Sequence, residues 1–139
     1  MPTISIKENN YSYTEDDVVN FAEGLVGLPK MRDAVFIALP DYKPFYWLAS
    51  LSDENTRFIV VDPNEMFADF SLPELTELDE MSILDKPNSV LSIVKISSDW
   101  EKTTVNLRAP ILLNWKTRKG VQIILSDSRY QLAEPLPRV

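Results

Sequence analysis

The sequence predicts an all-β, mainly antiparallel fold, arranged as a closed or nearly closed barrel or as a sandwich. Short runs of β-branched and aromatic residues recur at a spacing of roughly ten residues, as is typical of such folds. Ten prolines and only three glycines punctuate the chain, and no apolar stretch of helical period is long enough for a helix bundle. In Ser89–Ile96 polar and apolar residues partly alternate, which favours a strand with one buried and one wet face.

The expected strands are bounded mostly by Pro, Asp, Asn or Gly, residues that commonly begin turns. They are Thr3–Lys7, Val18–Phe21, Ala34–Leu39, Phe45–Ser50, Arg57–Val61, Ser89–Ile96, Thr103–Leu107, Ile111–Trp115 and Val121–Leu125. No internal repeat, linker or low-complexity segment interrupts them, so we expect a single domain over residues 1–139.

One or two short helical turns are expected beside the strands. The segment 72–81 carries an apolar residue at every third position, with Pro73 at its start and acidic residues on the other face. A second turn is expected over Asn64–Phe67, after the Asp62-Pro63 pair.

The composition excludes several classes of chemistry. The chain has no cysteine and no histidine, which removes disulfides, thiolate nucleophiles, His-ligated metals and the Ser-His-Asp triad. Carboxylate clusters remain, but each falls at an expected loop or helix end, where acidic residues usually cap turns. No apolar run is long enough to cross a bilayer and no signal peptide is recognisable at the N-terminus, so a cytoplasmic protein is expected.

The net charge of −7 is unevenly distributed along the chain. Residues 41–86 contain three basic and eleven acidic groups, whereas residues 87–139 contain eight basic and four acidic groups. This balance argues against direct nucleic-acid binding and favours a basic partner, with the acidic segment Glu74, Glu77, Asp79 and Glu80 as a candidate contact. The alternative is a solvated acidic surface that keeps the protein soluble.

The segment Phe21–Pro29 contains Gly24 and Gly27 but lacks the residues of a phosphate-binding loop. We expect these glycines to supply a positive φ or a close backbone approach at a sharp turn. Three large apolar residues in the same turn, Leu25, Val26 and Leu28, either cover the core or contact a partner.

A hairpin is expected near the C-terminus, with a basic tip at 116–119 that closes on Gly120. Trp115 stacking on a base beside these cations would suit a nucleic-acid module, but three cations at a hairpin tip are commonplace. A small nucleic-acid-binding β-barrel is therefore retained as an alternative function, and a carboxylate-dependent enzyme as another.

Several ordered blocks follow one another over about residues 18 to 130. The most specific block is Asn106-Leu107-x-Ala109-Pro110, followed by Asn114 and Gln122. The other blocks are Phe21-x-Glu23-Gly24-Leu25-x-Gly27, Pro44-Phe45-x-x-Leu48-x-Ser50, Phe58-x-Val60-x-Asp62-Pro63 and Tyr130. In this order and spacing the blocks resemble the FliW family of flagellar assembly factors. Two positions depart from residues common in the family, Leu28 from an aromatic and Ala49 from Gln.

The resemblance implies a distorted β-barrel-like fold without catalytic activity or cofactor. It also implies partner switching, in which the protein binds flagellin before secretion and, once freed, binds the RNA-binding regulator CsrA and relieves repression of flagellin translation. The free protein is expected to be a monomer without membrane contact. Six residues of these blocks are expected to have structural roles, namely Gly24, Gly27, Asn106, Pro110, Asn114 and Gln122.

Overall fold

The computed structural model describes residues 2–53, 55–71, 89–126 and 129–137. The strands in this part of the chain are β1 (Thr3–Ile6), β2 (Asn9–Ser12), β3 (Val18–Phe21), β4 (Asp33–Ala38), β5 (Tyr46–Ser50), β6 (Arg57–Val61), β7 (Ser89–Lys95), β8 (Thr104–Val105), β9 (Ile111–Asn114), β10 (Lys119–Gln122) and β11 (Glu134–Pro135). Short 3₁₀ turns lie between them, namely η1 (Glu15–Asp17), η2 (Pro40–Tyr42), η3 (Pro63–Glu65) and η5 (Trp100–Lys102).

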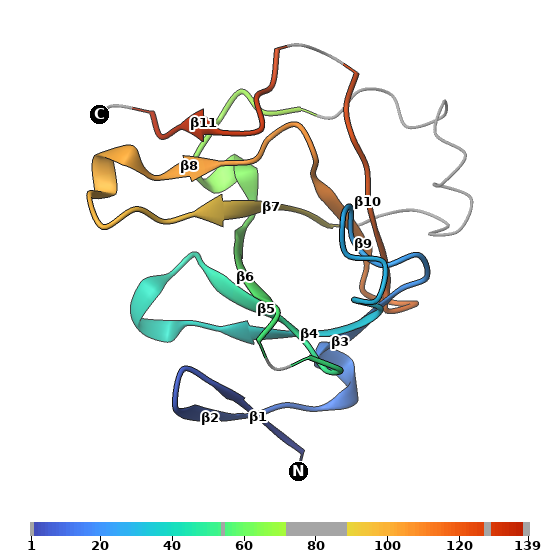
Figure 1. Ribbon diagram of the computed structural model, residues 1–139. Coiled ribbons are helices and arrows are strands. Elements are labelled where there is room, and N and C mark those ends of the chain that lie inside the picture. The colour runs from blue at the N-terminus through green and yellow to red at the C-terminus, as the bar shows by residue number, and fades with distance from the viewer. Residues whose placement is uncertain (1, 54, 72–88, 127–128, 138–139) are drawn as a thin grey trace.

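A closed barrel forms the centre of the molecule (Figure 1). Its strands follow one another in the order β3, β4, β5, β6, β7, β9 and β10, and β10 returns to β3. Every pair is antiparallel except β10 and β3, which are parallel. The predicted all-β, mainly antiparallel, barrel-like fold is therefore confirmed.

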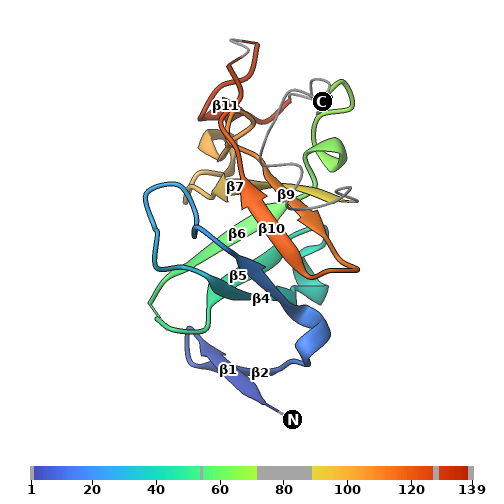
Figure 2. The same cartoon turned by 90° about the vertical axis from the view of Figure 1, so that its right-hand side faces the viewer.

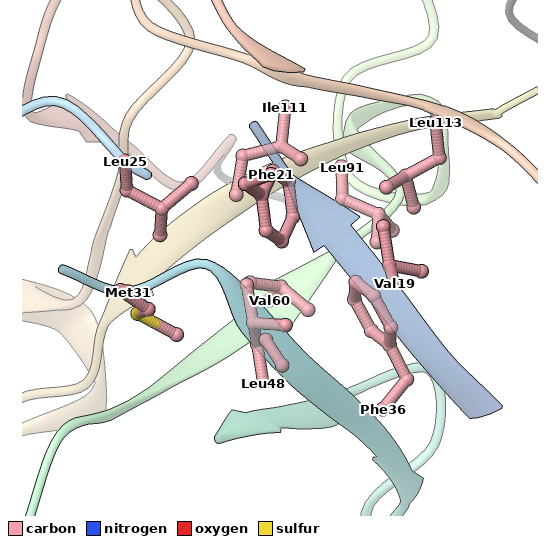
Figure 3. Close-up of a cluster of buried hydrophobic side chains, with 11 residues drawn as sticks. Val19, Phe21, Leu25, Met31, Phe36, Leu48, Val60, Leu91, Ile111 and Leu113 are labelled. Carbon is pink, nitrogen blue, oxygen red and sulfur yellow. The ribbon is translucent and has the colours of Figure 1, made fainter. Parts of the chain in front are cut away.

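The interior of the barrel is filled by alternate side chains of its strands, because successive residues of a strand point to opposite faces. Leu48 and Val60 point inward from β5 and β6, and Val19 and Phe21 point inward from β3 (Figure 3). The other buried members of this cluster are Leu25, Met31, Ala34, Phe36, Leu91, Ile111 and Leu113.

A hairpin of β1 and β2 covers part of the barrel's outer wall. Ile6 of the hairpin packs with Val35, Ile37 and Ala49, which point outward from β4 and β5. Figures 1 and 2 both show the hairpin below the barrel, at the opposite end from β11. Because both faces of β4 are covered, Ala34–Ile37 are four consecutive buried residues, a pattern that strict alternation would not give.

A second cover lies on the outer wall of β6 and β7. Val61 and Val94 point outward there and pack with Phe45 and Phe70, together with Val105 of β8. Tyr130 contributes to the same cluster, and its hydroxyl accepts a hydrogen bond from the Ser71 backbone N–H at 3.0 Å. The two covers thus bury the outer faces of different pairs of strands.

Several element predictions need correction. The strands β2 and β11 were not expected, because β2 has the polar sequence Asn-Asn-Tyr-Ser and β11 has only two residues, one of them proline. The last barrel strand spans Lys119–Gln122 instead of 121–125, although the Ile123 and Leu125 amides still bond back to 110 and 108. The turn expected near residue 64 is present as η3, which is one of four 3₁₀ turns among the described residues. The segment 72–81 lies outside the described residues.

The role expected for Gly120 is also wrong. The residue with positive φ in the hairpin turn is Arg118 (φ 57°), whereas Gly120 lies within β10. A Cβ atom on Gly120 would lie 2.5 Å from Cε1 of Phe21 and 2.7 Å from Cδ2 of Leu113. Glycine is therefore required here by packing against the barrel core and not by the turn.

Replacing Gly120 with Ala should lower the free energy of unfolding by about 1–3 kcal/mol, because the added methyl group must displace the Phe21 ring. Urea unfolding followed by circular dichroism measures this difference. Lys119→Ala, an exposed position in the same strand, serves as the matched control and should change stability by less than about 0.5 kcal/mol. Equal stability of both variants would contradict the packing role of Gly120.

Candidate interaction surface

The glycine turn after β3 is a tight reversal in which Leu25 and Leu28 pair. The Leu25 N–H donates to the Leu28 carbonyl at 3.1 Å and the Leu28 N–H donates to the Leu25 carbonyl at 2.8 Å. Gly24 and Gly27 have φ of 71° and 77°, a region that other residues enter at a cost. A Cβ on Gly24 would also clash with the backbone of Leu28 and Pro29. The expected positive φ and close backbone approach are thus both found.

This turn separates its three apolar side chains. Leu25 is buried in the barrel core with an exposed fraction of 3%, and Leu28 is partly buried against the same cluster. Val26 points outward and is 53% exposed. Leu25 therefore belongs to the core, whereas Leu28 packs partly on the core and also lines a surface pocket. Val26 is the most exposed of the three.

Gln122 joins the glycine turn to the Asn106–Pro110 segment. Its Oε1 accepts from the Val26 N–H at 2.8 Å and its Nε2 donates to the Ala109 carbonyl at 3.0 Å. The Oδ1 of Asn106 in turn accepts from the Ala109 N–H at 3.0 Å. Gln122 thus connects segments that are far apart in the sequence, whereas the Asn106 hydrogen bond closes a local turn. Both contacts suit an architectural role.

The other two residues of this motif also bond to the backbone. Pro110 is buried, and its carbonyl accepts from the Ile123 N–H at 3.1 Å. Asn114, 6% exposed, accepts from the N–H groups of Lys116 and Thr117 at 2.9 and 3.2 Å and so fixes the hairpin turn. Buried amides that satisfy turn backbone in this way support the fold directly.

One carboxylate from each of three acidic groups in the sequence accepts hydrogen bonds from a local turn. Asp17 accepts from the Thr14 N–H at 3.0 Å and Asp99 from the Glu101 N–H at 3.2 Å. Hydrogen bonds from the Thr56 hydroxyl and the Asn55 N–H lower the pKa of Asp53. Within the described ranges no three acidic residues gather as a metal site would require. The acidic segment Glu74, Glu77, Asp79 and Glu80 lies outside the described residues.

A groove of about 740 Å³ runs over the outer wall of the barrel between its two covers. Trp47 of β5 and Ile59 of β6, which are register partners, lie in its floor. Trp47 packs with the cluster under the β1–β2 hairpin, whereas Ile59 packs with the cluster over β6 and β7. The groove is therefore the part of the outer wall that lies between the cluster under the β1–β2 hairpin and the cluster over β6 and β7, and neither cluster covers it.

Exposed apolar side chains from two loops form the rim of this groove. Tyr42 at the end of η2 is 68% exposed, Ile96 after β7 is 45% exposed, and Trp100 in η5 is 50% exposed. The Trp100 ring meets Phe45 edge to face, with 6.1 Å between centroids. These loops lie on the same side of the barrel, at the left of Figure 1, together with the turn between β1 and β2.

Charged groups of both signs border the groove, with cations in excess. Lys7, Lys43 and Asp41 line it. The Lys7 Nζ lies 5.6 Å from the centroid of the Trp47 ring, and Cζ of Arg57 lies 5.9 Å from the same centroid. Both positions are within the range of cation–π contact. Among the described residues that line the groove, cations therefore outnumber carboxylates by two to one, in a chain whose net charge is −7.

Sequence reasoning did not single out any residue of this groove as a site. Its members come from five separate segments, and each is an ordinary strand or loop residue by itself. The one available signal was a pair of aromatic residues, Tyr42 and Trp100, in predicted loops bounded by Pro and Asp, where polar residues are usual.

Fold and surface together define a small closed β-barrel protein with an open apolar groove on its outer wall. Comparisons with known proteins identify its family. The family model described as FliW protein matches residues 5–136. The chain therefore belongs to the FliW family of flagellar assembly factors.

Individual relatives support the same assignment. The chain is 31% identical over 138 residues to the flagellar assembly factor FliW of Clostridium beijerinckii, covering 98% of each chain. It is 37% identical over 123 residues to that of Caldicellulosiruptor bescii, covering 86% of this chain and 79% of the relative. A crystal structure of the flagellar assembly factor FliW superposes with a TM-score of 0.86 at 24% identity, over 99% of each chain, which shows the common fold.

Among the residues that the structure describes, no helix has the length and apolar composition needed to cross a bilayer.

The two sides of the glycine turn should respond differently to truncation. Leu25→Ala removes a buried side chain from the barrel core and should lower the free energy of unfolding by about 2–5 kcal/mol. Val26→Ala, one residue away and exposed, is the matched control and should leave the melting curve nearly unchanged. Thermal and urea unfolding of both variants measure this, and a destabilised Val26→Ala with a stable Leu25→Ala would contradict the placement.

Proposed function

We propose that this chain is a cytoplasmic partner-switching protein that binds flagellin and the translational regulator CsrA and thereby relieves CsrA repression of flagellin synthesis. The observation that carries the proposal is the open apolar groove in a member of the FliW family. The chain acts as one domain and is monomeric when free. It binds no nucleic acid directly, contacts no membrane and catalyses no reaction.

An apolar groove supports the flagellin part of this proposal. The resemblance to the FliW family implies that the termini of flagellin are amphipathic helices. Such helices bind through apolar side chains at positions i, i+3 and i+4. Trp47 and Ile59 in the floor and Trp100 at the rim offer the aromatic and aliphatic contacts that dominate such interfaces. Val26 on the glycine turn is a second exposed apolar position for this partner.

Charge supports the CsrA part. The resemblance to the FliW family implies that CsrA presents a basic RNA-binding surface. A protein of net charge −7 is attracted toward such a surface. Eleven acidic groups lie between residues 41 and 86. We propose that the CsrA contact includes the acidic segment Glu74, Glu77, Asp79 and Glu80 within this part of the chain.

The alternative of a nucleic-acid-binding barrel has weaker support. Trp115, the candidate stacking residue, packs edge to face on Phe36 at 5.2 Å between centroids and donates to the Ser89 hydroxyl at 2.9 Å. Arg118 at the hairpin tip donates to the Glu15 carbonyl at 2.8 Å. Two of the groups needed to hold a base and a phosphate thus already have partners within the chain.

Calorimetric titration of the purified chain with flagellin and, separately, with CsrA tests the proposed function. We expect a saturable complex with each protein, and we expect flagellin added to the CsrA complex to release CsrA. Single-stranded RNA alone is the control and should give no heat of binding. If neither protein binds, or if RNA alone binds with an affinity that falls steeply with salt, the proposed function is wrong.

The rate of association with CsrA, measured by surface plasmon resonance at low salt, tests the acidic segment. A variant with Lys at 74, 77, 79 and 80 should associate with CsrA about tenfold more slowly at low salt, because electrostatic steering is lost. A matched variant with Lys at 8, 15, 16 and 101 has the same net charge and should retain more of the rate. Equal rates for the two variants would identify the segment as a solvated surface.

A further inference from the structure

We infer that the groove over Trp47 and Ile59 binds an amphipathic helical segment of flagellin that carries carboxylates beside its apolar face. The inference rests on the proposed function and assigns a surface and a chemistry to one of its partners. In this arrangement apolar side chains of the segment lie on the groove floor, and its carboxylates face Lys7 and Lys43.

The backbone of the groove floor excludes an added strand. Trp47 is on β5, which pairs with β4 on one edge and β6 on the other, and Ile59 is on β6, which pairs with β5 and β7. Neither strand has a free edge to accept another chain by main-chain hydrogen bonds. The floor therefore presents side chains only, a surface suited to the apolar face of a helix.

Burial of the rim supplies the driving force. Tyr42, Ile96 and Trp100 are 68%, 45% and 50% exposed and stand next to the apolar floor. Large exposed aromatic groups that surround a groove are typical of binding sites, because their apolar area is removed from water only when a partner is bound. Trp and Tyr are also the residues that most often dominate the energy of such interfaces.

Charge selects between the two partners. Among the described residues that line the groove there are two cations, Lys7 and Lys43, and one carboxylate, Asp41. A basic protein such as CsrA would place like charges against this surface, which weakens association. A segment with carboxylates next to its apolar face would instead be attracted to it.

The same surface is a poor match for a second copy of this chain. A two-fold dimer places the same patch of each subunit against the other. Here that arrangement would oppose two concave grooves and bring Lys7 and Lys43 near their own equivalents. The free chain should therefore remain monomeric even though the groove is apolar.

Two groove variants test the inference by titration with flagellin. Trp100→Ala and Tyr42→Ala should each weaken flagellin binding about tenfold or more, and both should bind CsrA as the wild-type chain does. Leu132→Ala, which removes an equally exposed apolar side chain outside the groove, is the matched control. Tyr42 is the more exposed of the two, so its variant keeps the test valid if Trp100→Ala alters the fold.

A charge-reversal pair tests the second half of the inference. Lys7→Glu combined with Lys43→Glu should weaken flagellin binding more than Lys116→Glu combined with Lys119→Glu, which makes the same change in net charge at the hairpin tip. Weaker binding only for the groove pair would support the predicted carboxylates. Equal or stronger binding by the groove pair would overturn them.

The possible failures are distinct. Wild-type affinity for flagellin in both apolar groove variants overturns the inference and leaves the proposed function intact. Loss of CsrA binding in these variants, or concentration-dependent self-association of the wild-type chain that the variants abolish, assigns the groove to another occupant and also overturns it. If the wild-type chain does not bind flagellin, both the inference and the proposed function fail.

Discussion

The barrel closes where β10 lies parallel to β3 and Gly120 packs against the ring of Phe21. These strands are far apart in the sequence, so the contact must bring the C-terminal hairpin to the beginning of the chain. The Asn20 N–H donates to the Arg118 carbonyl at 2.9 Å at the same junction. A side chain at position 120 would displace the Phe21 ring and the Leu113 methyl group, and the packing at the junction that closes the barrel would be weakened.

Closure of the barrel creates the need for its outer covers. A closed sheet has an inner and an outer face, and in this chain several strands are apolar on both. The β1–β2 hairpin buries the outer face of β4 and β5, and the segments around Phe70 and Val105 bury that of β6 and β7. The groove is what remains between these two covers, so its position follows from the fold.

Much of the fold could be predicted from the sequence, because strand signals are local. Val18–Phe21 and Arg57–Val61 match the expected strands at both ends, and the glycines of the turn after β3 have the expected positive φ. The strand β2 was not predictable, because its polar sequence has no local strand signal and it forms a strand only by pairing with β1. The role of Gly120 likewise depends on Phe21, nearly a hundred residues away in the chain.

The candidate site was less accessible to sequence reasoning. The sequence left both core cover and partner contact open for Leu25 and Val26, and only the structure separates them, because the turn buries Leu25 and exposes Val26. The groove depends on the register that places Trp47 beside Ile59 and on which parts of the wall the covers reach. Neither can be read from local patterns.

The chain's three tryptophans allow a direct test of the central claim that the uncovered barrel wall is the surface that binds flagellin. Trp47 and Trp100 line the groove, whereas Trp115 lies outside it, on Phe36. Indole N–H resonances of ¹⁵N-labelled protein, assigned by substitution, can be followed while unlabelled flagellin is added. If the groove binds flagellin, the Trp47 and Trp100 resonances should shift and the Trp115 resonance should not. A shift confined to Trp115 would contradict this claim. Saturation of binding with no change at Trp47 and Trp100 would contradict it as well.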